Sequence, residues 1–83
     1  MNTYEKVKKF FMEKKIKFDE EEDDYALTIF VDTAANSFMR IYKSKRNNKR
    51  TVITDFTDWE GYLDYEQKRI SFEHLKEQFY GRY

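Results

Sequence analysis

The sequence contains no cysteine and no proline, and it has only two glycines, Gly61 and Gly81, in 83 residues. Without cysteine the chain can form neither disulfides nor thiolate metal sites, so a cytoplasmic location is expected. Two isolated glycines cannot build a Gly-rich loop that binds phosphates. No apolar run approaches the roughly 18 residues of a membrane span, so we expect no membrane partner.

Histidine is nearly absent as well, because His74 is the only one in the chain. A zinc site needs several His, Cys or acidic ligands at fitting spacing, and a nucleophilic hydroxyl needs a neighbouring base. His74 follows Ser71 by three residues, near the start of an expected helix, where a structural role suffices. The sequence therefore predicts no catalytic residues, no metal and no cofactor, and a protein that is not an enzyme.

Aromatic and charged residues are abundant instead. One Trp, seven Tyr and eight Phe exceed what so small a core needs, so some should lie in surface binding patches. Sixteen basic and sixteen acidic residues cancel, but their signs alternate in blocks. Residues 19–36 carry seven acids and no base, whereas residues 37–51 carry six bases and no acid. The blocks indicate either neutralisation within the fold or a surface with two opposite poles.

Helical periodicity marks both ends of the chain. The first helix is predicted to begin after the cap residue Asn2, with Glu5 completing a capping box, and to end near Lys15. The last helix is predicted to begin after the cap residue Ser71 and to end before Gly81. Each helix carries a stripe of apolar residues with an i, i+3, i+7 spacing, typical of a helix packed on a core: Tyr4, Val7 and Phe11 in the first, and Phe72, Leu75 and Phe79 in the last.

Three strands are predicted between the helices, at residues 25–31 and in a hairpin over residues 37–56 centred on Asn47-Asn48. A two-residue turn there would pair Arg40 with Asp55 across the strands, a favourable contact between opposite charges. Residues 19–24 are six consecutive acids, which predict a solvated loop. Residues 57–69 predict a loop or short helical turn, followed by an extended approach to Ile70.

The predicted architecture is an α+β fold, a single compact domain over residues 1–83 with the order α-β-β-β-α. Its three-stranded antiparallel meander would pack with the two terminal helices. This order resembles the topology of the double-stranded RNA-binding domain. The resemblance stops at topology, because the last helix begins Ser71-Phe72-Glu73-His74 where that family has a cluster of lysines, and because the chain lacks the family's Gly-Pro loop.

The favoured function is a small non-enzymatic protein-binding module, an inhibitor, adaptor or regulator of the kind found in phages and mobile elements. It would act through an aromatic and charged surface, as a monomer or a homodimer. The alternative is a nucleic-acid-binding domain that uses the basic hairpin over residues 40–50. The candidate binding residues of both hypotheses are Phe38, Arg40, Tyr42, Lys43, Lys45, Arg46, Lys49, Arg50, Asp58, Trp59, Glu60 and Tyr62.

Overall fold

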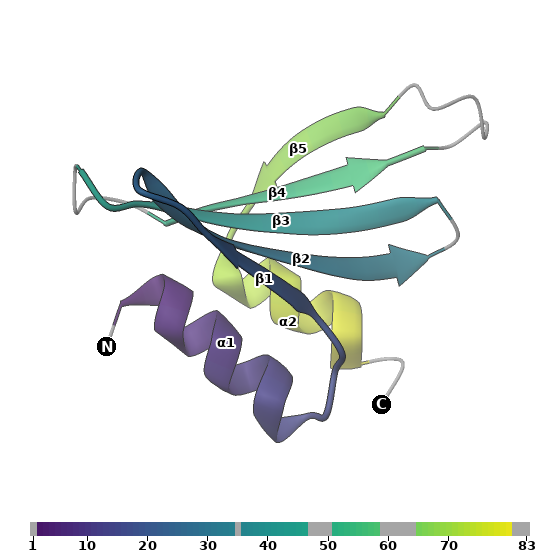
Figure 1. The fold of residues 1–83 in the computed structure, drawn as a ribbon. Helices are drawn as coiled ribbons and strands as arrows, with labels where there is room; N and C mark the ends of the chain where they lie inside the picture. The colour runs from purple at the N-terminus through teal and green to yellow at the C-terminus, as the bar shows by residue number, and fades with distance from the viewer. Residues whose placement is uncertain (1, 35, 47–50, 59–64, 81–83) are drawn as a thin grey trace.

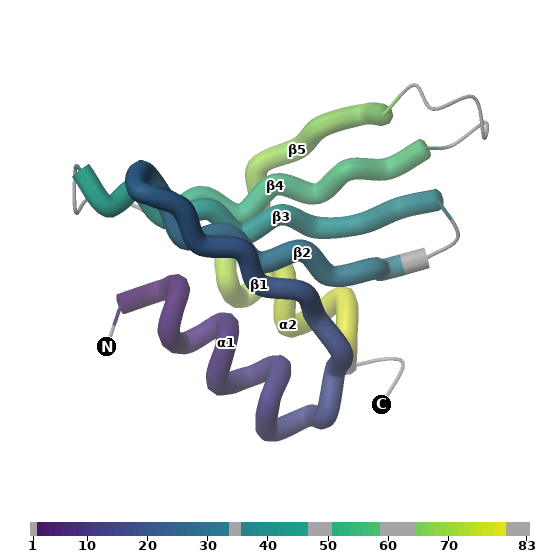
Figure 2. The backbone as a smooth tube through the Cα atoms, viewed as in Figure 1, coloured from purple at the N-terminus to yellow at the C-terminus, as the bar shows by residue number. Residues whose placement is uncertain are grey.

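The computed structural model describes residues 2–34, 36–46, 51–58 and 65–80. Along the chain, one helix comes before five strands and a second helix follows them (Figure 1). These elements are α1 (Thr3–Glu13), β1 (Asp19–Glu22), β2 (Ala26–Ala34), β3 (Ser37–Ser44), β4 (Thr51–Thr57), β5 (Glu66–Ile70) and α2 (Phe72–Tyr80). The strands form one antiparallel sheet in sequential order, and the path of the backbone in Figure 2 shows each strand turning back beside the previous one.

The predicted α+β class and both terminal helices are confirmed, but the prediction of three strands is wrong, because β1 and β5 extend the meander at its two edges. The extra strands also remove the likeness to the double-stranded RNA-binding domain in element order. The extended approach to Ile70 is confirmed as β5, whereas the turn predicted before it falls largely on residues 59–64, outside the described residues. No described helix is long and apolar enough to cross a membrane.

Both helix starts are capped as the sequence predicts. The Asn2 side chain accepts a hydrogen bond from the backbone N–H of Glu5 at 2.8 Å, and Ser71 Oγ accepts one from the backbone N–H of His74 at 3.1 Å. The first helix ends at Glu13 with Lys14 as its cap, and the next residue, Lys15, has a φ of 58° in the left-handed region. The N–H of Ile16 then bonds back to the carbonyl of Phe11 at 2.8 Å, which is the hydrogen-bond pattern of a Schellman motif.

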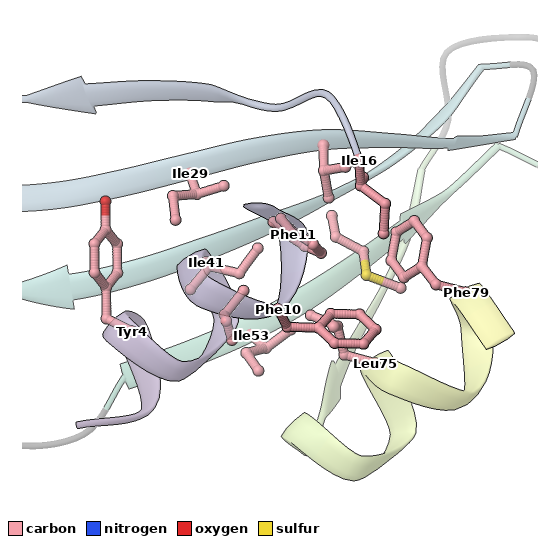
Figure 3. Close-up of a cluster of buried hydrophobic side chains, with 12 residues drawn as sticks. Tyr4, Phe10, Phe11, Ile16, Ile29, Ile41, Ile53, Leu75 and Phe79 are labelled. Carbon is pink, nitrogen blue, oxygen red and sulfur yellow. The ribbon is translucent and has the colours of Figure 1, made fainter. Parts of the chain in front are cut away.

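Both helices lie on the same side of the sheet (Figure 1). Between helices and sheet is the hydrophobic core, in which the rings of Phe10, Phe11 and Phe79 meet (Figure 3). Phe11 is fully buried and Phe79 is 2% exposed, whereas Phe72 is only half-buried against the core. The stripes predicted from helical spacing therefore do face the core, with Phe72 at its margin.

The predicted hairpin register is wrong by one residue. Arg40 lies opposite Thr54 rather than Asp55, and Phe38 rather than Met39 lies opposite Phe56. A one-residue shift moves every side chain of a strand to the other face, so Val52, Thr54 and Phe56 point away from the helices. What fixes the register is a row of four isoleucines on the helix side of β2 to β5: Ile29, Ile41, Ile53 and Ile70.

The six acids at residues 19–24 were predicted to form a loop, and the first four form the edge strand β1 instead. Two of the six charges are paired with cations in the fold. Glu20 accepts hydrogen bonds from the Tyr4 hydroxyl at 2.6 Å and from Lys8 Nζ at 2.9 Å, while Glu22 accepts one from Lys45 at 2.6 Å. These contacts offset the repulsion that makes an isolated acidic run disordered.

Candidate binding face

The side of the sheet that faces away from both helices is called the open face here. The strand register places five of its side chains in one row that crosses all five strands. From β1 to β5 this row consists of Asp19, Phe30, Arg40, Thr54 and Arg69. It begins with an acid and ends with a base, so the open face has a charge gradient across the strands.

Four aromatic rings gather on the open face, next to Arg40. Phe38 stacks on Phe56 with ring centroids 4.6 Å apart and an angle of 9° between the planes. Tyr65 meets Phe38 edge-on at 5.4 Å, and Phe30 meets Phe38 at 6.3 Å. Phe56 is buried beneath its neighbours, whereas the other three rings remain half-buried. Mutual packing of this kind holds the exposed ring faces in fixed positions.

Arg40 occupies the centre of the open face on β3. Its guanidinium carbon lies 5.1 Å from the centroid of the Phe56 ring, a cation–π geometry. The Nε atom of Arg40 is buried and has no hydrogen-bond partner among the described residues. Leaving such a donor unsatisfied typically costs about 1–3 kcal/mol, so this nitrogen is a candidate contact for a bound acceptor.

A pocket of about 280 Å³ opens beside Arg40, over β4 and β5. Its lining residues include Arg40, Thr54, Gln67 and Arg69 of the open face. Lys68 also lines it, but the register directs its side chain to the helix side, opposite Asp55, so the two arginines supply the positive charge. Among the described residues, no carboxylate lines it. Side chains of this composition offer positive charge and hydrogen-bond donors, which bind anionic groups.

The structure brings together three of the predicted binding residues and separates the others. Phe38, Arg40 and Tyr42 all lie on the open face, and Tyr42 is 38% exposed. Lys43 is one residue further along β3, so its side chain lies on the helix side, where it pairs with Leu27. It lines a second, polar pocket of about 420 Å³ near the start of α1.

The remaining cations of the predicted basic hairpin make contacts within the fold. Lys45 forms its ion pair with Glu22, and the Arg46 guanidinium lies 4.5 Å from the centre of the Tyr25 ring. Lys49 and Arg50 lie outside the described residues. The described part of the hairpin is therefore not one continuous basic ribbon.

The acidic and aromatic candidates after β4 are only partly described. Asp58 is buried, and its backbone N–H donates a hydrogen bond to Ser37 Oγ at 3.5 Å. Trp59, Glu60 and Tyr62 lie outside the described residues. Their predicted part in binding remains a prediction.

Several carboxyl groups have pKa values shifted by their surroundings. The hydrogen bond from Tyr4 and the one from Lys8 lower the pKa of Glu20, and burial together with the same contact raises the pKa of Tyr4. Backbone N–H groups of Tyr25 and Ala26 lower the pKa of Asp23. These groups lie around β1, away from the Arg40 pocket, so they stabilise the fold at the acidic edge.

Asp55 behaves in the opposite way, because burial raises the pKa of this carboxyl while the charges of His74 and Lys68 lower it. It lies on the helix side of β4, opposite Met39, whereas the predicted register had paired it with Arg40. Among the described residues, no group of three or more His, Cys, Asp or Glu side chains could hold a metal ion.

The prediction from sequence missed five of the residues that line the pocket and three of the rings. Gln67, Lys68 and Arg69 were not identified because β5 was not predicted, and Val52 and Thr54 because the predicted register put them on the other face. Phe30, Phe56 and Tyr65 were not placed beside Phe38. The positions of the isoleucines in the sequence were the signal that could have given the correct register. Aligning Ile41 with Ile53 in the core would have placed Thr54 and Phe56 on the open face.

Comparison with known proteins finds no matching family model, no matching curated protein and no matching solved structure.

Proposed function

We propose that the chain is a small, non-enzymatic protein-binding module whose partner docks on the open face of the sheet. The observation that carries the proposal is the combination of packed aromatic rings and a central arginine on a sheet face that faces away from both helices. In this role the module acts as an inhibitor, adaptor or regulator by occupying a surface on its partner.

The composition of the open face supports a protein partner. Aromatic residues and arginine dominate the residues that contribute most to protein–protein affinity, because they combine large apolar area with hydrogen bonding. Three of the four rings keep a part of their surface in solvent, and Tyr42 adds a fifth, more exposed ring. Side chains on strands of a sheet lose little freedom on binding, which favours affinity.

The charge gradient supports the choice of protein over nucleic acid. Asp19 and Glu21 lie on the open face of β1, and Arg69 lies about 19 Å away on β5, given strands spaced about 4.8 Å apart. A nucleic-acid backbone carries negative charge along its whole length. A nucleic-acid chain that crossed the open face from β5 to β1 would therefore be repelled by these acids. A protein surface can carry an acid opposite Arg69 and a base opposite Asp19.

Nucleic-acid binding is the second candidate, because stacked rings next to cations are also what single strands bind. The basic hairpin gives it less support than the sequence suggested, since Lys45 and Arg46 contact Glu22 and Tyr25. If the protein binds nucleic acid, its affinity for oligonucleotides should fall steeply as the salt concentration rises.

The test is site-specific photo-crosslinking in cells of the native host. A photoreactive phenylalanine analogue replaces Tyr42 on the open face, and in a matched control it replaces Met12, which is 64% exposed on α1. We expect a protein adduct from position 42 and not from position 12. The purified partner should then bind the wild type at least about tenfold more tightly than the Arg40→Glu variant, while Lys9→Glu binds as the wild type does.

Adducts of equal yield from both positions, or an adduct that nuclease destroys, would overturn the proposal. The second outcome would favour the nucleic-acid candidate. Circular dichroism of Arg40→Glu must match the wild type, so that loss of binding is not loss of fold. Should that variant unfold, Arg69→Glu on the exposed edge strand replaces it.

A further inference from the structure

The pocket beside Arg40 differs in charge from the rest of the molecule. Two arginines of the open face, Arg40 and Arg69, line it, and no acid does among the described residues, although acids and bases are equal in number in the whole chain. A cluster of like charges is unfavourable without a counter-charge. Elsewhere in the described residues, Lys8 and Lys45 each lie against a carboxylate, at 2.9 Å and 2.6 Å.

Arg40 is positioned to receive that counter-charge. Its guanidinium carbon lies 5.1 Å from the centroid of the Phe56 ring, and Nε is shielded from water with no hydrogen-bond partner among the described residues. A carboxylate can accept two parallel hydrogen bonds from one guanidinium, which matches this fork. The desolvation of Nε has been incurred in the free protein. A carboxylate that turns the guanidinium toward the pocket therefore gains this hydrogen bond without that part of the penalty.

The other polar groups of the pocket extend the same chemistry. Thr54 lies beside Arg40 on the neighbouring strand, and Arg69 lies beside Thr54 on the next. Thr54 therefore lies between two arginines in the register, and its hydroxyl can add one more donor to the same anion. Because Thr54 is buried and Arg69 is exposed, the pocket has a floor and an open rim.

We infer that this pocket is a subsite for a carboxylate group, supplied by a Glu or Asp side chain of the protein that docks on the open face. The inference rests on the proposed function for the source of the carboxylate. The adjacent rings of Phe38 and Phe56 give the ligand a second requirement, an apolar side chain next to the acid. The recognised segment therefore pairs an acidic residue with an aromatic or aliphatic one.

Nitrogen-15 NMR tests the subsite directly, because the Nε–H of Arg40 gives its own signal. The probes are a capped peptide of alternating Phe and Glu, its counterpart with Gln in place of Glu, inorganic phosphate, and a short oligothymidine. We expect the Glu peptide to shift the Arg40 Nε–H signal and the amide signals of Thr54 and Arg69. The Gln peptide should bind at least about tenfold more weakly, as loss of a charge-assisted contact implies.

Two variants separate a built site from general attraction. Arg69→Gln removes a cation at the rim and should weaken the Glu peptide about tenfold. Lys9→Gln removes a cation of the outer α1 surface and should leave the affinity within about twofold of the wild type. Equal weakening by both variants would overturn the subsite, because it would show attraction by net charge alone.

The outcomes also separate the subsite from the proposed function. If the crosslinked partner binds Arg69→Gln as tightly as it binds the wild type, the subsite is wrong and the protein-binding function stands. If the Glu peptide shifts Arg40 but no partner crosslinks to position 42, the function is wrong and the anion pocket stands. Oligothymidine that binds more tightly than the Glu peptide, with a steep salt dependence, would overturn a protein source for the anion.

Discussion

The two faces of the sheet are made by alternate residues of the same strands, yet they have opposite chemical character. On the helix side, Ile29, Ile41 and Ile53 form a row beneath α1 and α2 and are at most 4% exposed. On the open face the neighbouring row passes through Phe30, Arg40 and Thr54. The comparison shows a division of labour, in which one face holds the fold together and the other is available for recognition.

The largest expected effect comes from breaking the helix-covered face. Phe11→Ala should lower the free energy of unfolding by about 3–5 kcal/mol, because the ring is fully buried against Phe79 and Phe10. The matched change on the open face, Phe30→Ala, should cost only about 1–2 kcal/mol, since that ring is half-buried. Urea denaturation of both variants measures the difference.

Phe72→Ala provides an intermediate case, because Phe72 lies on the helix side but is only half-buried. It should cost less than Phe11→Ala. If Phe11→Ala and Phe30→Ala lowered the free energy of unfolding equally, the division between the faces would be contradicted. Both rings would then contribute equally to stability.

Arg40→Met should sharpen the comparison by changing the two properties in opposite directions. Methionine keeps an apolar stem over Phe56 and removes the buried Nε that has no partner among the described residues. The free energy of unfolding should rise by about 1 kcal/mol, while affinity for the partner falls. Thermal denaturation and titration calorimetry on the same sample measure both. A fall in stability would show that the guanidinium supports the fold.

Tyr4→Phe tests whether a contact on the helix side also sets how the stability of the fold depends on pH. A lowered pKa means that Glu20 stabilises the fold above its unfolded pKa of about 4.3 and loses this effect as the pH falls through the lower folded pKa. Removing the Tyr4 hydroxyl should cost under about 1 kcal/mol at pH 7, given that the Glu20 side chain is 31% exposed.

The variant should also lose less stability than the wild type between pH 5 and pH 3 or so, as the Glu20 pKa rises toward its usual value. Unfolding curves recorded across this range decide the matter. Parallel curves for the two proteins would mean that the hydrogen bond does not hold the carboxylate in its charged form.

The smallest effect belongs to the surface. Lys45→Ala should change stability by less than about 0.5 kcal/mol, because the ion pair with Glu22 is solvent-exposed. A larger loss, measured by the same denaturation, would show that β1 is held to the hairpin mainly by this contact. Partner binding at Arg40 should be unaffected.

Local signals in the sequence were sufficient for the helices and the inner strands. The caps at Asn2 and Ser71 and the apolar spacing between Tyr4 and Phe11 depend on neighbours along the chain, and all are confirmed. The edge strand β1 could not be predicted in this way, because what stabilises its acids comes from Tyr4, Lys8 and Lys45, far away in sequence.

The register error had a different cause. The predicted register depends on a charge pair between Arg40 and Asp55, and a cross-strand pair contributes only about 0.2–1 kcal/mol. Burying Ile53 opposite Ile41 contributes more. The candidate site suffered most, since Phe38, Arg40 and Tyr42 were identified together while their partners on β4 and β5 were not.

The acidic edge strand has a consequence for how the protein behaves at high concentration. An exposed edge is a template for sheet growth, and β1 offers only acids, Asp19, Glu20, Glu21 and Glu22, all of them exposed. A second copy paired along the same edge would set like charges against each other, which blocks growth of the sheet there. Because this barrier to self-assembly consists of charge repulsion between exposed groups, added salt should screen it and make it weaker.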